Sequence, residues 1–345
     1  KNAESVINQL KIEEKEEIQE IMAYPDDSAG ALMATDVFTL YQDTTCGEAI
    51  RTLQDQKDAE MVFYLYITDE DNSLVGVASL RALATTSPDT ALKNIMVKKV
   101  HKIRPETDQE EAAQLVAQYN YLAVPVVDAD NILLGIITVD DVVDVIREEA
   151  TEDFLQMAGA GKDREILLKS SWENAKIRFP WLFASWIGGI IASYIIGNYE
   201  NMLENIIALA AFIPIIIGMG GNIGTQSSTI IVRGMATGRI TIGDEFKIII
   251  KELEVGLILG VLYGLMLGVF ATFRFVDYAP MIGMVIGLSI CSSMLIATAV
   301  GTFIPLILRK LDIDPAIATG PFVTTSIDIL GVFLYFIISS YLLSI

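Results

Sequence analysis

The sequence predicts two parts of different fold class: an α+β soluble half, followed by an all-α polytopic membrane domain with five transmembrane helices. Mean hydropathy is +0.47 and 52% of the residues are hydrophobic, values typical of a membrane protein, yet the formal net charge is −20. Residues 1–170 hold 33 Asp and Glu against 15 Lys and Arg, whereas residues 171–345 hold 11 against 9. An acidic soluble half therefore precedes an apolar half.

This composition excludes several classes of protein. An acidic surface repels phosphate backbones, so we expect no nucleic-acid partner. One histidine, His101, and two cysteines, Cys46 and Cys291, cannot supply a zinc site or a disulfide framework. The sequence shows no positioned base, nucleophile or metal cluster, so we expect no enzyme. No signal peptide and no initiator Met are seen at Lys1, and we expect the chain to begin inside a longer parent.

The soluble half begins with residues 1–24, which are expected to be a helical remnant of an N-terminal domain. An internal repeat follows, because five positions match five others at an offset of 63: Val37, Leu40, Thr44, Ala49 and Leu53 against Val100, Ile103, Thr107, Ala112 and Val116. Each copy is predicted to contain a short strand, an amphipathic helix, two strands around an Asp-Asn turn, and a second helix. Residues 62–67 and 123–127 are predicted to be buried strands.

The repeat resembles a tandem pair of CBS domains, here 25–92 and 93–148, a module that often senses adenine nucleotides or ions. Thr138 and Asp141 in the second copy are similar to the Thr-x-x-Asp that holds ribose in nucleotide-binding members of that family. The first copy has Ser79 and Ala82 at these positions and lacks the Asp. The resemblance implies at most one site for a nucleotide such as ATP, and whether the chain uses it stays open.

The helix after the second copy carries an acidic stripe. Asp141, Asp144, Glu148 and Glu152 fall within an arc of about 80° at 100° per residue. A solvated charged face is the ordinary explanation of such a stripe. However, it has few basic neighbours and runs toward the membrane through a connecting helix predicted over 149–178. Divalent cations bound to these carboxylates would sharply reduce the repulsion among them. Cation binding could then control a gate.

Five apolar segments are long enough to span a bilayer, which needs about 20 residues. They are 180–198, 205–232, 253–273, 280–308 and 316–342, within a membrane domain over 179–345. If the first span enters from the cytoplasm, nine Lys and Arg residues flank the cytoplasmic side and only Arg274 flanks the outer side. We therefore expect the N-terminal half in the cytosol and the C-terminus, Ile345, outside the plasma membrane.

Small residues predict how the third and fourth spans meet. Helices in lipid associate through close backbone approach at small residues. Glycines recur every four residues in the third span, at Gly256, Gly260, Gly264 and Gly268, and the fourth span has Gly283, Gly287 and Cys291. This ridge is predicted to be an ordinary packing face.

The second span carries polar groups that packing alone does not explain. Pro214 and four glycines are expected to loosen this helix and expose carbonyl groups, which membranes tolerate only where protein or water covers them. The span would then face a wet cavity, while a glycine hinge against a neighbouring helix remains the alternative. Asn222 and Thr225 add side-chain oxygen atoms to this span and are candidate ion-binding residues.

The fifth span is expected to start at Asp314-Pro315 and to carry Thr324 and Asp328. An ionised carboxylate deep in a bilayer costs about 2.5–3.5 kcal/mol, and no Lys or Arg lies at matching depth to pair with Asp328. A protonated Asp and an Asp that faces a permeating cation are the remaining interpretations. Carboxylate, amide, hydroxyl and carbonyl oxygens suit hard cations such as Mg²⁺. Mg²⁺ gives up its bound water molecules reluctantly.

The order of these modules, with GGNIGTQS in the second span and DPAIATGPFVTTSID in the fifth, resembles the MgtE family of magnesium channels. The resemblance implies a homodimer with a pore lined by the second and fifth spans, where Asp328, Gly218 and Gly221 form the ion site. It also implies regulatory Mg²⁺ bound by acids on the CBS pair and connecting helix: Asp108, Glu110, Asp140, Asp141, Asp144, Glu149, Glu152, Asp153 and Asp314. Thr225, Gly320 and Asn120 depart from the residues of well-known members.

The leading hypothesis is therefore a dimeric Mg²⁺ channel or transporter that cytosolic Mg²⁺ closes. Two alternatives remain. The same architecture would also suit another divalent cation, such as Mn²⁺ or Co²⁺, and a membrane-anchored nucleotide sensor without transport would leave Asp328 unexplained.

Overall fold

The structure is a computed structural model of the whole chain, and it describes residues 21–55, 64–163, 166–240, 243–278, 280–311 and 313–343. The chain divides into two compact units, residues 1–149 and 150–345. Most of the expected helical remnant at 1–24, and the expected outer end at Ile345, lie outside the described residues.

The first unit contains the predicted repeat. The first copy holds β1 (Thr39–Tyr41), α4 (Cys46–Asp55), β2 (Tyr64–Thr68), β3 (Leu74–Ser79) and α5 (Leu80–Thr85). The short helix α3 (Ala29–Leu32) precedes this copy, and a 3₁₀ turn at Leu92–Asn94 follows it. The second copy holds α6 (Gln109–Tyr119), β4 (Ala123–Val127), β5 (Leu133–Thr138) and α7 (Val139–Met157). The strand β2 pairs with β1 in parallel and with β3 antiparallel, and β4 pairs antiparallel with β5. The predicted element order is confirmed, although the first strand of the second copy is only a bridge between Ile103 and Val126.

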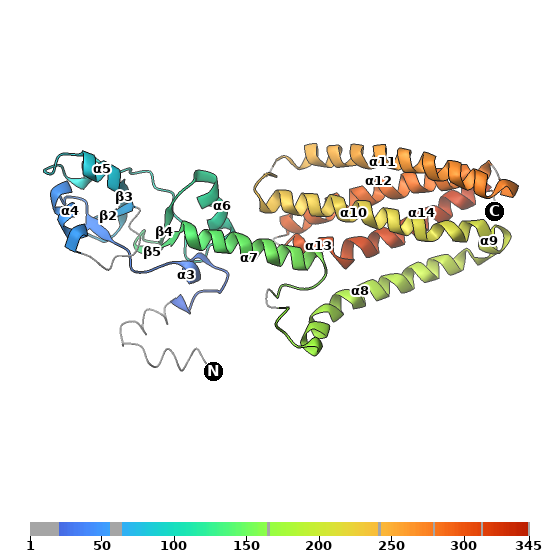
Figure 1. Cartoon of the computed structure of the whole chain (residues 1–345), viewed down its shortest axis with the longest axis horizontal. Coiled ribbons are helices and arrows are strands. Elements are labelled where there is room, and N and C mark those ends of the chain that lie inside the picture. The colour runs from blue at the N-terminus through green and yellow to red at the C-terminus, as the bar shows by residue number, and fades with distance from the viewer. Residues whose placement is uncertain are drawn as a thin grey trace. The chain divides into compact units, whose positions relative to one another are not determined.

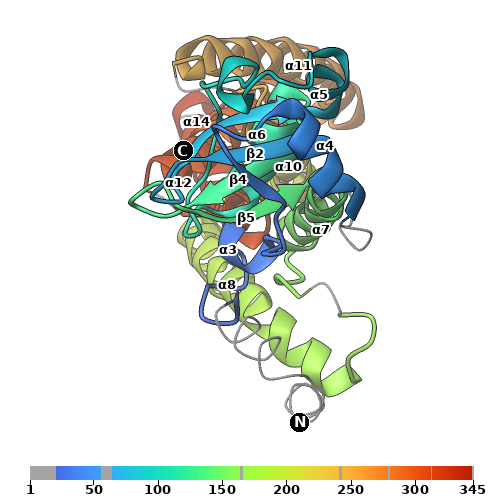
Figure 2. The same ribbon diagram turned by 90° about the vertical axis from the view of Figure 1, so that its left-hand side faces the viewer.

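The Asp-Asn turns form because asparagine tolerates the left-handed conformation. Asn72 has φ 60° and Asn131 has φ 67°. The two turns also join the copies: the Leu74 amide donates to the Asn131 carbonyl at 2.9 Å, and Asn131 Nδ2 donates to the Leu74 carbonyl at 2.8 Å. Figure 2 shows the strands of this unit from the front.

The second unit is all helical. It contains α8 (Ser171–Asn198), α9 (Glu200–Asn205), a 3₁₀ segment at Ile207–Phe212, α10 (Ile213–Ala236), α11 (Glu245–Arg274), a 3₁₀ turn at Val276–Tyr278, α12 (Met281–Lys310), α13 (Ala316–Thr319) and α14 (Pro321–Leu343). Within the residues that the structure describes, five segments are long and apolar enough to cross a membrane, as predicted, namely α8, α10 with its preceding 3₁₀ segment, α11, α12 and α14. The most enclosed of them is α12, which packs against α10, α11 and α14, while α8 packs on α14 and is largely uncovered (Figure 1).

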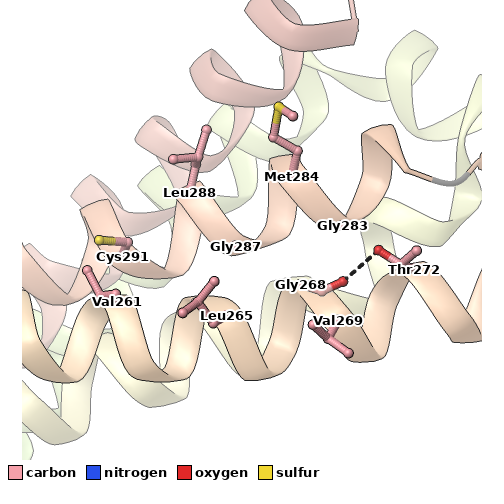
Figure 3. A pocket seen from close by; sticks show the side chains of 11 residues that line it. Val261, Leu265, Gly268, Val269, Thr272, Gly283, Met284, Gly287, Leu288 and Cys291 are labelled. Carbon is pink, nitrogen blue, oxygen red and sulfur yellow. Dashed lines mark hydrogen bonds between the residues drawn. The ribbon is translucent and has the colours of Figure 1, made fainter.

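The glycine ridge is confirmed as a packing face. Gly264 lies against the Gly287 carbonyl and Gly268 against the Gly283 carbonyl, so the backbones of α11 and α12 touch directly. Figure 3 shows the shallow groove along this crossing, where Thr272 Oγ1 donates to the Gly268 carbonyl at 2.9 Å. The groove is lined by small and apolar side chains, which do not suit an ion.

Two expectations about the pore-bearing spans are wrong. The helix α10 is continuous, because Pro214 lies in its first turn, where no amide donor is required. Two of its glycines serve packing instead, because Gly220 and Gly224 are buried against Ile327 of α14. The fifth span does not run on from Asp314-Pro315, since α13 ends at Gly320 and α14 begins at Pro321. Proline disfavours helical geometry in the residue before it, which explains the break.

The segment 149–178 is not one connecting helix. The helix α7 ends at Met157 and α8 begins at Ser171, after a capping box formed by Ser170 and Glu173. Gly159 and Gly161 adopt φ values of 69° and 89°, which end a helix readily because glycine lacks a Cβ atom.

Candidate functional site

Asp328 is the only acidic residue of α10 and α14, and it is half-buried on the second turn of α14. Gly221 of α10 lies beside it: a Cβ atom built on Gly221 would stand 3.8 Å from Asp328 Oδ1. The side chain of Asn222 is exposed on α10, and nothing lies within 4 Å of a Cβ atom built on Gly218. The carboxylate therefore sits at an uncrowded, polar surface of this unit.

The other predicted pore residues are distributed unevenly. Thr225 is half-buried on α10, and Thr324 lies one turn before Asp328, where its hydroxyl reaches the carbonyls of Gly320 and Pro321 at 3.4 and 3.3 Å. Gly320 is buried against the backbone of Gln156 and Gly159. It therefore belongs to the contact between the end of α7 and α14, away from Asp328.

A second polar cluster lies where the end of α7 meets the segment before α13. Gln156 Nε2 donates to Asp314 Oδ2 at 2.7 Å and to Glu152 Oε1 at 3.2 Å. Lys162 Nζ lies 3.1 Å from Glu152 Oε1 and 3.5 Å from Asp314 Oδ2. The other oxygen of Asp314, Oδ1, accepts from the amide of Ala316 at 2.8 Å and so caps α13. Two acids of the predicted regulatory set are thus brought together.

Asp153 adjoins this cluster. Burial raises the pKa of Asp153 to about 6, and repulsion from Asp314 adds to the effect, while the charges of Arg233 and Lys162 oppose it. Burial alone would lower the pKa of Lys162, but its hydrogen bond and charge interaction with Glu152, together with Asp314, outweigh burial and raise it. The lysine is therefore held as an ammonium ion.

The remaining predicted regulatory acids lie in the first unit, and several of them make local contacts. Asp108 caps α6 by accepting from the Glu110 amide at 2.8 Å, and Glu149 accepts from Gln109 Nε2 at 2.5 Å. Asp144 is exposed and lies 3.7 Å from Arg147, and Asp140 is exposed at the start of α7. Within the described residues, no group of three or more His, Cys, Asp or Glu side chains is placed to hold a metal ion.

Thr138 and Asp141, the two residues that the resemblance assigns to a nucleotide, are hydrogen-bonded to each other. Thr138 Oγ1 donates to Asp141 Oδ2 at 2.7 Å, at the junction of β5 and α7. In the first copy the equivalent Ser79 instead caps α5, accepting from the Ala82 amide at 3.1 Å.

Sequence reasoning missed Gln156 and Lys162. Gln156 follows Glu152 by four residues, which places both on one face of α7, so helical spacing is a signal that would have found it. Lys162 lies in the irregular segment after α7, where no periodicity indicates a neighbour.

Both units of the chain match known protein families. A family model described as MgtE, divalent cation transporter, matches residues 213–338, and the CBS domain model matches residues 29–88 and 92–148. The magnesium transporter MgtE of Enterococcus faecalis is 37% identical over 329 residues, which is 95% of this chain and 72% of that protein. The chain belongs to the MgtE family.

A further relative and a solved structure are also similar to this chain. The magnesium transporter MgtE of Bacillus subtilis is 35% identical over 331 residues, covering 96% of this chain and 73% of that protein. A crystal structure of the cytosolic domain of the Mg²⁺ channel MgtE in complex with ATP is 39% identical, covers 41% of this chain and 58% of that chain, and has a TM-score of 0.40. MgtE proteins are transporters, so family membership confirms that this membrane protein is not an enzyme.

Proposed function

We propose that this MgtE-family chain carries Mg²⁺ across the membrane through a pore lined by α10 and α14, with Asp328 at the ion site. The observation that carries the proposal is the Asp328 carboxylate beside Gly221, with Asn222 exposed nearby. An ionised carboxylate within a membrane segment is a functional feature by default, because its desolvation is otherwise unfavourable. Gly221 leaves room beside the carboxylate for an ion that keeps part of its water shell.

A homodimer is part of this proposal. One face of α10 and α14 lies on the surface of a single chain, because Asn222 and Gly218 are exposed and Asp328 is half-buried. A second copy facing the same surface would enclose them and double the number of carboxylates at the ion site. In this arrangement the first unit lies in the cytosol and the C-terminus outside, as the distribution of Lys and Arg favours.

Reconstituted proteoliposomes test the pore. Mg²⁺ uptake should be lost in Asp328→Asn, which keeps the shape of the side chain but removes its charge. Asp277→Asn removes a carboxylate from the exposed turn between α11 and α12 and serves as the matched control. Unchanged uptake in Asp328→Asn contradicts the proposed ion site. Competition by Mn²⁺ and Co²⁺ in the same assay decides between Mg²⁺ selectivity and the alternative of another divalent cargo.

We also propose that cytosolic Mg²⁺ closes the pore by binding the acids of α7 and Asp314. The carboxylates on the acidic face of α7 repel one another, and bound divalent cations would reduce this repulsion. Replacing Asp141, Asp144 and Glu152 together by their amides should leave uptake open at high internal Mg²⁺. Inhibition that persists unchanged in this triple variant contradicts the placement of the sensor.

Adenine nucleotide binding is the finer part of the proposal, and the Thr138–Asp141 pair supports it because a carboxylate and a hydroxyl suit ribose hydroxyl groups. ATP binding without any cation flux would favour the alternative of a nucleotide sensor.

A further inference from the structure

Lys162 occupies the place where a cation would meet Glu152 and Asp314. Its Nζ lies 3.1 Å from Glu152 Oε1 and 3.5 Å from Asp314 Oδ2. The two carboxylate side chains are only 16% and 32% exposed, whereas the lysine side chain is 61% exposed. The carboxylates are thus held in place, while the lysine reaches them from solvent and is free to leave.

Gln156 is the buried member of this cluster. The residue is 1% exposed, and its Nε2 donates to both carboxylates. Its other amide atom, Oε1, is buried and has no hydrogen-bond partner in the described part of the chain. Because Oε1 accepts no hydrogen bond, turning the amide so that its oxygen and nitrogen exchange places breaks no bond of that atom.

The amide of Gln156 has two useful orientations. The oxygen and nitrogen exchange places when the amide turns by half a rotation, since they are similar in size and shape. With Nε2 toward the carboxylates, the amide donates to them. With Oε1 toward them, it would repel the carboxylates unless a cation lay between, and it would then supply a third oxygen ligand of the kind that hard cations prefer.

We propose that Lys162 is a tethered competitor of the regulatory cation at this cluster. The inference rests on the proposed role of Glu152 and Asp314 in binding cytosolic Mg²⁺. In the absence of the ion, the ammonium group neutralises the two carboxylates. A divalent cation displaces it, binds Glu152 Oε1 and Asp314 Oδ2, and takes Oε1 of Gln156 as a neutral ligand.

Competition by Lys162 raises the cation concentration that is needed to fill the site. The ion must break both contacts of Lys162 before it binds, so its apparent affinity falls by the stability of those contacts. Exposed ion pairs are weak, so we expect Lys162 to lower the apparent affinity by about three- to tenfold, which corresponds to about 0.7–1.4 kcal/mol for the two contacts together. Because Asp314 Oδ1 continues to cap α13, the exchange is confined to the other oxygen of the same carboxylate.

Direct binding measurements test the competition. The full chain in lipid nanodiscs is titrated with Mn²⁺, and electron paramagnetic resonance gives the number of bound ions and the half-saturating concentration. Lys162→Gln should lower the half-saturating concentration of one ion by about three- to tenfold. Lys169→Gln, which removes the same charge from the same segment but pairs with Asp163, is the matched control and should leave it unchanged. Adding Gln156→Met to Lys162→Gln should weaken the binding again.

Two results overturn the inference, and a third separates it from the proposed function. An unchanged or weaker affinity in Lys162→Gln shows that the lysine does not compete. An equal gain in Lys169→Gln shows that only overall charge matters. Asp314→Asn should lose one bound ion; if it keeps all of them, the cluster is not a regulatory cation site and the proposed sensor fails there. If Asp314→Asn loses the ion while Lys162→Gln does not tighten it, only the competition fails.

Discussion

Gly221 of α10 faces Asp328 of α14 so closely that a methyl group on the glycine would stand 3.8 Å from the carboxylate oxygen Oδ1. That distance is ordinary van der Waals contact, so Gly221→Ala should fold normally. The methyl group would, however, fill space that a partly hydrated ion needs. We expect Mg²⁺ uptake to fall about fivefold, the effect of a barrier raised by about 1 kcal/mol.

Gly218 provides the matched control for this prediction. It lies one turn earlier on α10, and nothing stands within 4 Å of a Cβ atom built there. Gly218→Ala makes the same chemical change without approaching Asp328. Equal uptake by the two variants in proteoliposomes would show that the space beside Asp328 does not limit transport.

The turn after α7 gives a second prediction. Gly159 has φ 69°, and a Cβ atom there would lie 3.1 Å from Cδ of Pro321, the first residue of α14. Gly159→Ala should therefore loosen this turn from the start of α14 and increase protease cleavage between α7 and α8. Gly238→Ala is the control, because Gly238 has φ 65° but an open surrounding. Both substitutions carry the left-handed penalty of about 1–2 kcal/mol, so cleavage that rises equally in both would contradict the contact with Pro321.

Sequence patterns predicted the features that depend on local chemistry or on periodicity. The Asp-Asn turns and the glycine ridge of α11 follow from residue types at fixed spacing, whereas the Thr138–Asp141 pair was indicated by the resemblance to CBS domains. The break before Pro321 was missed because the apolar run continues through it, and hydropathy does not register a single disfavoured dihedral angle. The contacts of Asp314 with Gln156 and Lys162 join segments more than 150 residues apart, and no single-sequence pattern reports such a pairing.

The crossing of α11 and α12 gives a third prediction. A Cβ atom on Gly264 would lie 2.5 Å from the Gly287 carbonyl, and backbone cannot move aside without separating the two helices. Gly264→Ala should destabilise the membrane unit by about 1–3 kcal/mol, the usual range for overpacking. In a thermal unfolding measurement in detergent, this corresponds to a loss of about 2–10 °C. Gly189→Ala on α8, where nothing lies within 4 Å, should leave the unfolding temperature unchanged, and a similar loss in both variants would contradict the close helix contact.

The Thr138–Asp141 hydrogen bond gives the last prediction. The hydroxyl of Thr138 holds Oδ2 of Asp141 at 2.7 Å, which fixes the carboxylate at the start of α7. Thr138→Val keeps the size of the side chain but removes this hydrogen bond to a charged group, a contribution of about 1.5–3 kcal/mol. If the pair orients the carboxylate toward ribose, calorimetry on the full chain should show ATP affinity about tenfold weaker in Thr138→Val. Ser79→Ala removes the corresponding hydroxyl of the first copy, where no acid follows, and should leave ATP affinity unchanged. Loss of affinity in Ser79→Ala but not in Thr138→Val would place the nucleotide in the first copy, because only the hydroxyl that contacts or orients a ligand group influences its binding.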